Sequence, residues 1–304
     1  MRRWFLVILG LALAAGLAAC AGKAPQLATP TGERTAYAHP EMLAETGWLR
    51  DHLNGAAVRV VDLRSRQSYE AGHIPNAIWY DSAKLKDPED KLHVIRDSLF
   101  AQYMGELGVG DTTTVVAYDD QGGLWATRLW WVLDYYGHDG GKVLNGGWQE
   151  WQKAGLPTTK EIPTVQKATF TAQANPNAVA LADYVQKATS DPKVVILDAR
   201  SLAEYQGSDV RAARGGHIPK AVNLEWTRAL TTSEPRTWHS AEELRAMFEK
   251  AGVSPDKEVI TYCQTGVRAA HALFTLRLLG YDHVRVYDGS WLEWGNDRSR
   301  PIEQ

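Results

Sequence analysis

The sequence predicts an α/β protein built from two copies of one domain, each a parallel sheet flanked by helices. Two observations lead to this prediction. An internal repeat returns after about 140 residues, and short apolar strands alternate with helical patterns in both halves. The length of 304 residues fits two domains of ordinary size. A chain with 44% hydrophobic and 23% charged residues can also bury a core in each of them.

The repeat keeps the same order in both halves. The matching segments are residues 58–65 and 194–201, 72–77 and 216–221, 115–118 and 259–262, and 147–151 and 290–294. This period is too long for a solenoid and indicates a duplicated domain. We therefore predict a first domain at residues 41–157, a linker at 158–172 and a second domain at 173–304.

The elements of each half follow from hydrophobic patterning. Four runs of β-branched and aliphatic residues predict buried strands: residues 58–63 and 113–118 in the first half, 194–199 and 258–262 in the second. Helices are expected at residues 126–136 and 269–279, each followed by a glycine, Gly137 or Gly280, as is usual just past a helix end. Strands that alternate with helices imply crossover connections and parallel pairing.

The first residues predict a targeting segment that should be left out of the fold. Arg2 and Arg3 precede an apolar run at residues 4–19, which is shorter than the ~20 residues of a spanning helix. Residues 17–20 read Leu-Ala-Ala-Cys and resemble the lipobox of bacterial lipoproteins, which implies cleavage after residue 19 and a lipid on Cys20. A plain secretory peptide cleaved at the same place is the alternative.

We expect residues 20–40, rich in Ala, Thr, Gly and Pro, to form a flexible tether to the membrane. Ala21, and not Asp, follows the candidate lipidation site Cys20. In Gram-negative lipoproteins this resembles an outer-membrane address, so the protein is expected to face the periplasm.

Composition excludes several function classes. A net charge of −3 argues against a nucleic-acid partner. The two cysteines, Cys20 and Cys263, cannot build a disulfide framework, and no Cys/His cluster has the spacing of zinc ligands. We therefore expect neither a metal nor another cofactor, and the sequence leaves the oligomeric state open.

Cys263 is the candidate nucleophile because it stands between a predicted strand and a predicted helix, where the chemistry of parallel sheets is usually placed. The backbone N–H groups of the following loop can turn inward to bind an anion, and the helix N-terminus adds positive charge. Such surroundings lower a thiol pKa from about 8.5 and produce the nucleophilic thiolate. The alternative is a small buried cysteine without chemical function. The loop residues expected to bind substrate are Gln264, Thr265, Gly266, Val267 and Arg268.

Three arginines outside the loop are further candidates for binding an anionic substrate: Arg200, Arg211 and Arg214. The last two belong to residues 207–214, a basic insertion relative to the first half. In the first half Asp119 stands at the place of Cys263. A carboxylate cannot carry a persulfide, so Asp119 is expected to cap a helix or to shape the interface.

Together these motifs resemble the tandem-domain rhodanese family of thiosulfate and 3-mercaptopyruvate sulfurtransferases. The resemblance is carried by Asp-Ala-Arg at residues 198–200, Gly-His-Ile-Pro at 216–219, Cys-Gln-Thr-Gly-Val-Arg at 263–268 and Tyr-Asp-Gly-Ser-Trp-Leu-Glu-Trp at 287–294. It implies two rhodanese-like domains, of which only the second is catalytic.

The resemblance also implies a double displacement. Cys263 takes sulfur from thiosulfate or 3-mercaptopyruvate and passes it, as a persulfide, to a thiophilic acceptor such as cyanide or a thiol. Arg268 and the basic insertion favour thiosulfate. Because a lone reactive thiol outside the cytoplasm is easily oxidised, we expect Cys263 to rest as a persulfide or recessed between the domains, with the first half as a wall.

Two other function classes remain as alternatives. Cysteine phosphatases and arsenate-reductase-like enzymes place five residues between the cysteine and an arginine. Here four residues, 264–267, separate Cys263 from Arg268. The shorter loop suits a sulfur atom better than a tetrahedral oxyanion. A non-catalytic lipoprotein that binds a partner through a rhodanese scaffold is the second alternative.

Overall fold

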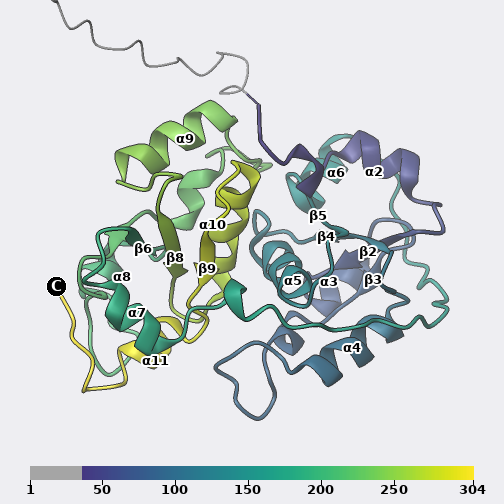
Figure 1. The fold of residues 1–304 in the computed structure, drawn as a ribbon. Helices are drawn as coiled ribbons and strands as arrows, with labels where there is room; N and C mark the ends of the chain where they lie inside the picture. The colour runs from purple at the N-terminus through teal and green to yellow at the C-terminus, as the bar shows by residue number, and fades with distance from the viewer. Residues whose placement is uncertain (1–35) are drawn as a thin grey trace, which may run out of the picture.

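A computed structural model describes residues 36–304. The predicted signal peptide, Cys20 and the tether up to residue 35 therefore lie outside the described residues. The described chain forms two α/β units that lie side by side, with helices α5 and α10 between their sheets (Figure 1). Among residues 36–304 no helix combines the length and the apolar character needed to cross a bilayer.

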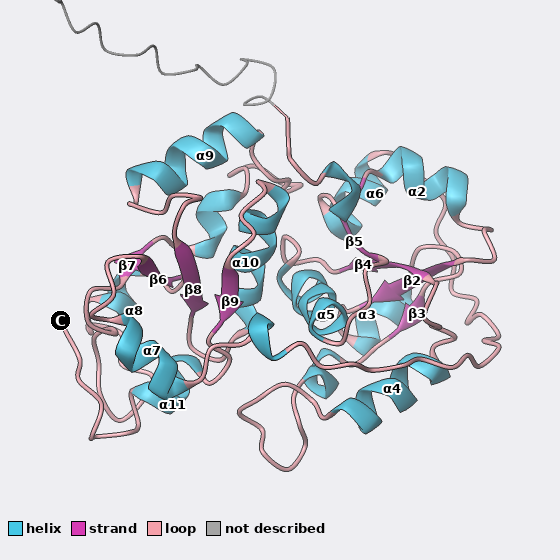
Figure 2. Cartoon of the chain, viewed as in Figure 1, coloured by secondary structure: helices cyan, strands magenta, loops and turns pink. Residues whose placement is uncertain are grey.

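The first unit is a parallel sheet with strand order β1-β5-β4-β2-β3, covered by helices (Figure 2). Its strands are β1 (Leu43–Ala44), β2 (Val58–Asp62), β3 (Ile78–Trp79), β4 (Thr114–Tyr118) and β5 (Gly141–Leu144). Its helices are η1 (Pro40–Met42), α2 (Thr46–His52), α3 (Arg66–Ala71), η2 (Ser82–Leu85), α4 (Asp97–Glu106), α5 (Leu124–Tyr135) and α6 (Gly147–Lys153).

The second unit repeats this plan with strand order β7-β6-β8-β9, again all parallel. Its strands are β6 (Val194–Asp198), β7 (Val222–Asn223), β8 (Glu258–Tyr262) and β9 (Val284–Val286). Its helices are η3 (Pro176–Ala178), α7 (Ala182–Ala188), α8 (Leu202–Tyr205), η4 (Trp226–Ala229), α9 (Ala241–Lys250), α10 (Val267–Leu278) and α11 (Ser290–Trp294). A single parallel bridge from Val179 to Val286 stands where β1 pairs with β5 in the first unit.

The predicted fold class is confirmed, and each predicted strand and helix is present within two residues of its expected ends. The two helices α5 and α10 begin two residues earlier than predicted. Each follows a glycine in the left-handed region, Gly123 with φ 85° and Gly266 with φ 80°. Each glycine is the N-cap residue of its helix, so the helix begins at the next residue. Arg268 therefore lies in the first turn of α10.

The two units share one hydrophobic core cluster. Trp130 of α5 meets Phe274 of α10 edge to face, with ring centroids 5.0 Å apart. The loop before α5 also packs on the second unit, because a Cβ at Gly123 would come within 2.6 Å of the Trp238 ring. The interface therefore resembles the inside of a domain, although each unit also has a smaller hydrophobic cluster of its own.

Segments outside the two sheets are also attached. Within the predicted tether, the Tyr37 hydroxyl donates to the His239 carbonyl, and the Ala38 N–H donates to the Leu278 carbonyl at 3.0 Å. In the predicted linker, Phe170 is buried and the Thr171 N–H donates to Asp111. The chain is thus held to the second unit from Tyr37 onward, and the linker follows the surface of the first.

The shared core leads to a test of stability. The Phe274→Ala variant should lower the free energy of unfolding by about 3–5 kcal/mol, because it empties a fully buried site that both units line. Denaturant titration followed by tryptophan fluorescence should still show one transition. Leu202→Ala, at an exposed position, is the control and should change stability by less than about 0.5 kcal/mol. Two separate transitions, only one of them shifted by Phe274→Ala, would contradict a shared core.

Candidate active site

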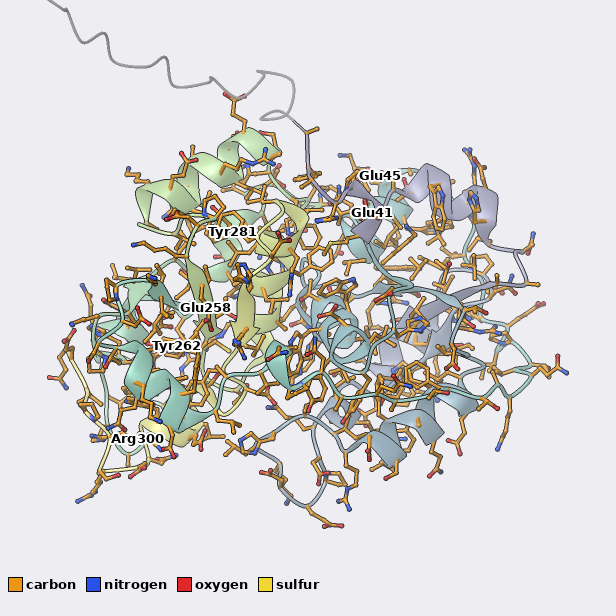
Figure 3. All side chains as sticks on the ribbon, viewed as in Figure 1. Glu41, Glu45, Glu258, Tyr262, Tyr281 and Arg300 are labelled. Atoms are coloured by element: carbon orange, nitrogen blue, oxygen red, sulfur yellow. The ribbon has the colours of Figure 1, made fainter. Side chains whose placement is uncertain are left out.

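The loop that carries Cys263 follows β8, whose last residue Tyr262 is labelled in Figure 3, and leads into α10. The Cys263 side chain is buried, with 1% of the residue exposed. Its N–H donates to the Ser290 hydroxyl at 3.1 Å, and its carbonyl accepts from the Trp291 N–H at 2.9 Å. The start of α11 therefore fixes the position of Cys263.

Gly266 allows the loop to turn tightly into α10. A Cβ at this position would lie 2.1 Å from the Asp288 Oδ1 atom, and its φ of 80° is one that other residues rarely adopt. Two constraints therefore require a glycine here, the backbone conformation and the close approach of a buried carboxylate.

The first unit shows what this kind of turn binds. Asp119, at the place of Cys263, accepts four backbone N–H groups of its own loop and helix: Gln121 at 2.8 Å, Gly123 at 2.9 Å, Trp125 at 2.7 Å and Ala126 at 2.9 Å. Burial raises the pKa of Asp119, whereas these donors favour its ionised form. The expectation that Asp119 caps a helix is confirmed, because two of its donors lie in the first turn of α5.

Counted from the glycine before each helix, the donors Gly123, Trp125 and Ala126 correspond to Gly266, Arg268 and Ala269, and the loop after Cys263 is one residue shorter than the loop after Asp119. Within the described part of the chain, no protein acceptor is recorded for the N–H groups of these three residues of the second unit. By analogy with Asp119, we expect these N–H groups to face a negatively charged atom on Cys263. The turn is therefore built to hold one negative charge, and the helix α10 points its N-terminus at that charge.

Arg268 has a partner that the sequence did not reveal. Its guanidinium forms two bonds with Glu204, at 2.7 and 2.8 Å, and the Glu204 side chain is only 1% exposed. Burial acts to raise the pKa of Glu204, but Arg268 and the capping interactions with Ser201 outweigh it and hold the pKa at about 2. Arg268 is therefore one half of a neutral buried pair close enough to Cys263 for a thiolate to affect its pKa.

The other predicted arginines differ in their surroundings. Arg211 is half exposed, pairs with Asp209 at 2.6 Å and reaches Glu204 at 3.7 Å. The carbonyl of Arg211 accepts from the Gln264 side chain at 2.9 Å, so the insertion does lie beside the loop. Arg214 instead donates to main-chain carbonyls near the C-terminus, among them Trp294 at 2.9 Å.

Arg200 is buried and binds Asp198 at 2.6 Å and the Gly216 carbonyl at 2.8 Å. Arg64 makes the same contacts with Asp62 and Gly72 in the unit that has no cysteine. The repetition indicates that Arg200 positions the loops after the strands. Substrate binding by Arg200, Arg211, Arg214 and the residues of the Cys263 loop stays a prediction.

The first unit contributes two cations to this region, which sequence reasoning missed. Arg128 of α5 is fully buried and pairs with Asp288 at 2.6 and 3.2 Å. Lys86, just after η2, reaches the same carboxylate at 3.2 Å. These residues are 160 and 202 positions away from Asp288 in the sequence, so no local pattern could have paired them.

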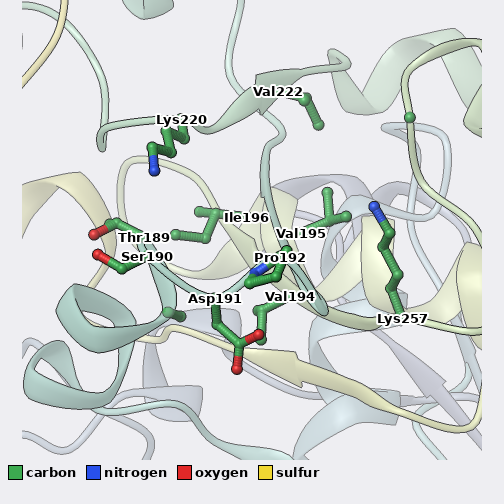
Figure 4. A pocket seen from close by; sticks show the side chains of 12 residues that line it. Thr189, Ser190, Asp191, Pro192, Val194, Val195, Ile196, Lys220, Val222 and Lys257 are labelled. Atoms are coloured by element: carbon green, nitrogen blue, oxygen red, sulfur yellow. The ribbon is translucent and has the colours of Figure 1, made fainter.

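A separate cavity of about 440 Å³ lies at the opposite end of the second sheet. It is lined by the turn before β6 and by the first residues of that strand, with Lys220 and Lys257 on either side (Figure 4). Cys263 follows the other end of the parallel sheet, so this cavity is not part of the Cys263 site.

Comparisons with known proteins agree with the duplication. The sequence matches the rhodanese-like domain family twice, at residues 45–154 and 181–297. It is 38% identical to the sulfur carrier protein TtuD of Thermus thermophilus over 88% of this chain and 98% of that protein. It is 36% identical to a thiosulfate sulfurtransferase of Azotobacter vinelandii, again over 88% of this chain and 98% of that protein.

Solved structures give the same result. The 3-mercaptopyruvate sulfotransferase SseA of Escherichia coli superposes with a TM-score of 0.74 at 32% identity, covering 82% of this chain and 98% of that one. A structure of EanB with ergothioneine gives a TM-score of 0.78 at 25% identity, covering 86% of this chain and 70% of that one.

The Arg268–Glu204 pair predicts a pH-dependent loss of stability. Arg268→Gln leaves a buried carboxylate without its partner and should cost about 3 kcal/mol of unfolding free energy at pH 7. Because the pKa of Glu204 is lowered in the folded protein, the pair stabilises fully above pH 4.5 and loses its effect as the pH falls toward 2. The deficit of the variant should therefore shrink between pH 5 and pH 3 in urea titrations.

Arg211→Gln is the matched control, since it removes an exposed guanidinium near the same carboxylate. It should change the unfolding free energy by less than about 1 kcal/mol. A deficit for Arg268→Gln that is equal at pH 7 and pH 3 would show that Glu204 is not the origin of the effect.

Proposed function

The chain belongs to the rhodanese family, and from this premise we propose that it is a sulfurtransferase that works through a persulfide on Cys263. The donor is thiosulfate or 3-mercaptopyruvate, and the acceptor is a thiophile such as cyanide or a small thiol. The observation that carries the proposal is the turn around Cys263, whose counterpart in the first unit already encloses the Asp119 carboxylate with four N–H donors.

With thiosulfate, the Cys263 thiolate attacks the outer sulfur, the S–S bond of the donor breaks, and sulfite leaves with the bonding electrons. The enzyme then carries Cys263–S–S⁻. A nucleophile such as cyanide attacks the outer sulfur, forms thiocyanate and returns the thiolate. The N–H groups of residues 264–268 and the N-terminus of α10 stabilise the anionic sulfur in both steps.

The choice of donor rests on the relatives more than on charge. Arg268 and Arg211 were expected to favour a doubly charged anion, but their charges are balanced by Glu204 and Asp209. Relatives named thiosulfate sulfurtransferase support thiosulfate. The pairing of Arg268 also disfavours a phosphatase reaction, because that arginine would have to release Glu204 before it could bind a tetrahedral anion.

The first test is the identity of the sulfur-carrying atom. After incubation with thiosulfate or 3-mercaptopyruvate, mass spectrometry should find one added sulfur on the peptide that contains Cys263. Cys263→Ser should gain none and should lose thiosulfate:cyanide transfer, with an unchanged circular dichroism spectrum. A non-catalytic binding protein would take up no sulfur from either donor, and turnover by the folded serine variant would refute the mechanism.

For location, we propose that the protein is a lipoprotein of the bacterial cell envelope, anchored through Cys20 and facing the periplasm from the outer membrane. Support comes from the sequence alone, in the Leu-Ala-Ala-Cys run at residues 17–20 and the Ala21 that follows. Attachment by several acyl chains would be stable where one chain is not.

The anchor can be tested by fractionation. Wild-type protein should remain in washed membranes, whereas Cys20→Ala should move to the soluble or secreted fraction and lack lipid by mass spectrometry. Cys263→Ser, which changes the other cysteine, is the control and should stay with the membranes. If Cys20→Ala fractionates like the wild type, the anchor is a different one.

A further inference from the structure

We propose that Lys86, from the domain without a nucleophile, is a positioning residue of the reaction: its ammonium group supplies the positive charge that stabilises anionic sulfur on Cys263. This inference deepens the proposed function and rests on it. Three observations support it: the contacts of Lys86, the charges around Cys263, and the packing of Asp288, the partner of Lys86, against the loop that carries Cys263.

Lys86 is held in place by two acceptors. Its Nζ donates to the Leu92 carbonyl within the first domain and to Asp288 Oδ1 of the second domain at 3.2 Å. Only 19% of the Lys86 side chain is exposed, and Asp288 is almost fully buried. The ammonium group is therefore fixed at the domain boundary and largely removed from water.

Asp288 is adjacent to the catalytic loop on two sides. Its Oδ1 atom lies 2.1 Å from a Cβ built on Gly266, and Ser290, two residues later, accepts the Cys263 N–H at 3.1 Å. Arg128, the other partner of Asp288, points its Nη1 at the Gly266 carbonyl, 3.4 Å away. The position of Lys86 is thus coupled to the backbone that holds the thiol.

The charges in this region do not cancel. Asp288 has two cationic partners, Arg128 at 2.6 Å and Lys86 at 3.2 Å. Burial acts to raise the pKa of Asp288, but both cations lower it below its ordinary value, so the carboxylate stays ionised. One carboxylate with two cations leaves one positive charge without a partner.

Two arginines of the second domain form balanced pairs. Arg268 is matched by Glu204, and Arg200 is matched by Asp198. Among these pairs the surplus cation belongs to the Asp288 cluster, and a thiolate or persulfide on Cys263 would balance it. Charges of opposite sign in a partly desolvated site attract more strongly than they do in water.

The titration of Lys86 agrees with this geometry. Burial, followed by Arg128, lowers the pKa of Lys86 to about 8, while Asp288 and an ionised Cys263 act in the opposite direction. The charged groups that face Lys86 are Arg128 from α5, Asp288 from the loop before α11 and Cys263 from the loop after β8. Lys86 is therefore cationic below pH 8 and loses its stabilising charge above it.

The test is the pH dependence of Cys263 alkylation by iodoacetamide, a small reagent, in Lys86→Met and in the wild type. An opposite charge close to a titrating group shifts its pKa by about 1–3 units. The thiol midpoint should therefore rise by about one unit in Lys86→Met, with alkylation about tenfold slower below the midpoint. Lys84→Met is the matched control, because Lys84 is on η2 and its Nζ lies over the Tyr103 ring. It should keep the wild-type midpoint.

A second variant separates charge from structure. Lys86→Arg keeps a cation that does not titrate, so its thiol midpoint should equal that of the wild type. Sulfur transfer by the wild type should decline above pH 8, where Lys86 loses its proton, and this decline should be absent in Lys86→Arg.

A wild-type thiol midpoint in Lys86→Met, shown to be folded by circular dichroism, would overturn the proposal, as would a decline near pH 8 that persists in Lys86→Arg. If Lys86→Met does not fold, the Lys86→Arg profile decides alone. The proposed function fails separately, if the wild type takes up no sulfur from either donor. The alkylation midpoints need no donor and are informative in either case.

Discussion

The buried carboxylate of Asp288 is the interaction on which the rest of the site depends. A carboxylate removed from water requires partners, and here both charged partners, Arg128 and Lys86, come from the other domain. The same carboxylate packs against Gly266, at the point where the catalytic loop turns into α10. The contact between the domains and the geometry of the Cys263 loop therefore both depend on the position of Asp288.

The duplication separates scaffold from chemistry. In each domain the hydroxyl of a Tyr at the end of a strand accepts a backbone N–H, from Ile74 for Tyr118 and from Ile218 for Tyr262. The Asp–Arg pairs of the two domains also have matching contacts. The domains differ in the side chain that follows. The Asp119 carboxylate accepts N–H groups of its own turn, whereas Cys263 places a buried thiol at the matching turn. The turns thus differ in this residue and in length, since the loop before α5 is one residue longer.

Sequence patterning was sufficient for the fold, because continuous apolar strands and glycines at helix boundaries are local signals. It also placed Cys263 between a strand and a helix, where the structure has it. It did not reveal the partners of the charged residues. Arg268, which is still predicted to bind an anionic substrate, pairs with Glu204, which is 64 residues away. Lys86 and Arg128 meet Asp288 only through the domain interface. Ion pairs of this kind leave no periodicity, and only the folded chain brings their members together.

The balance of charges explains why the inert domain has more than a packing role. A buried ion pair rarely stabilises a protein better than apolar residues of the same shape, so stability alone is a weak reason for Arg128 and Asp288 at this interface. Both residues also contact the loop, since Asp288 packs against Gly266 and Arg128 Nη1 lies 3.4 Å from the Gly266 carbonyl. Lys86 then adds a charge that no carboxylate in the cluster balances. A wall made only of apolar side chains would shield the thiol from oxidants but would also destabilise its ionised form. A wall that carries one surplus cation excludes solvent and favours the thiolate at the same time.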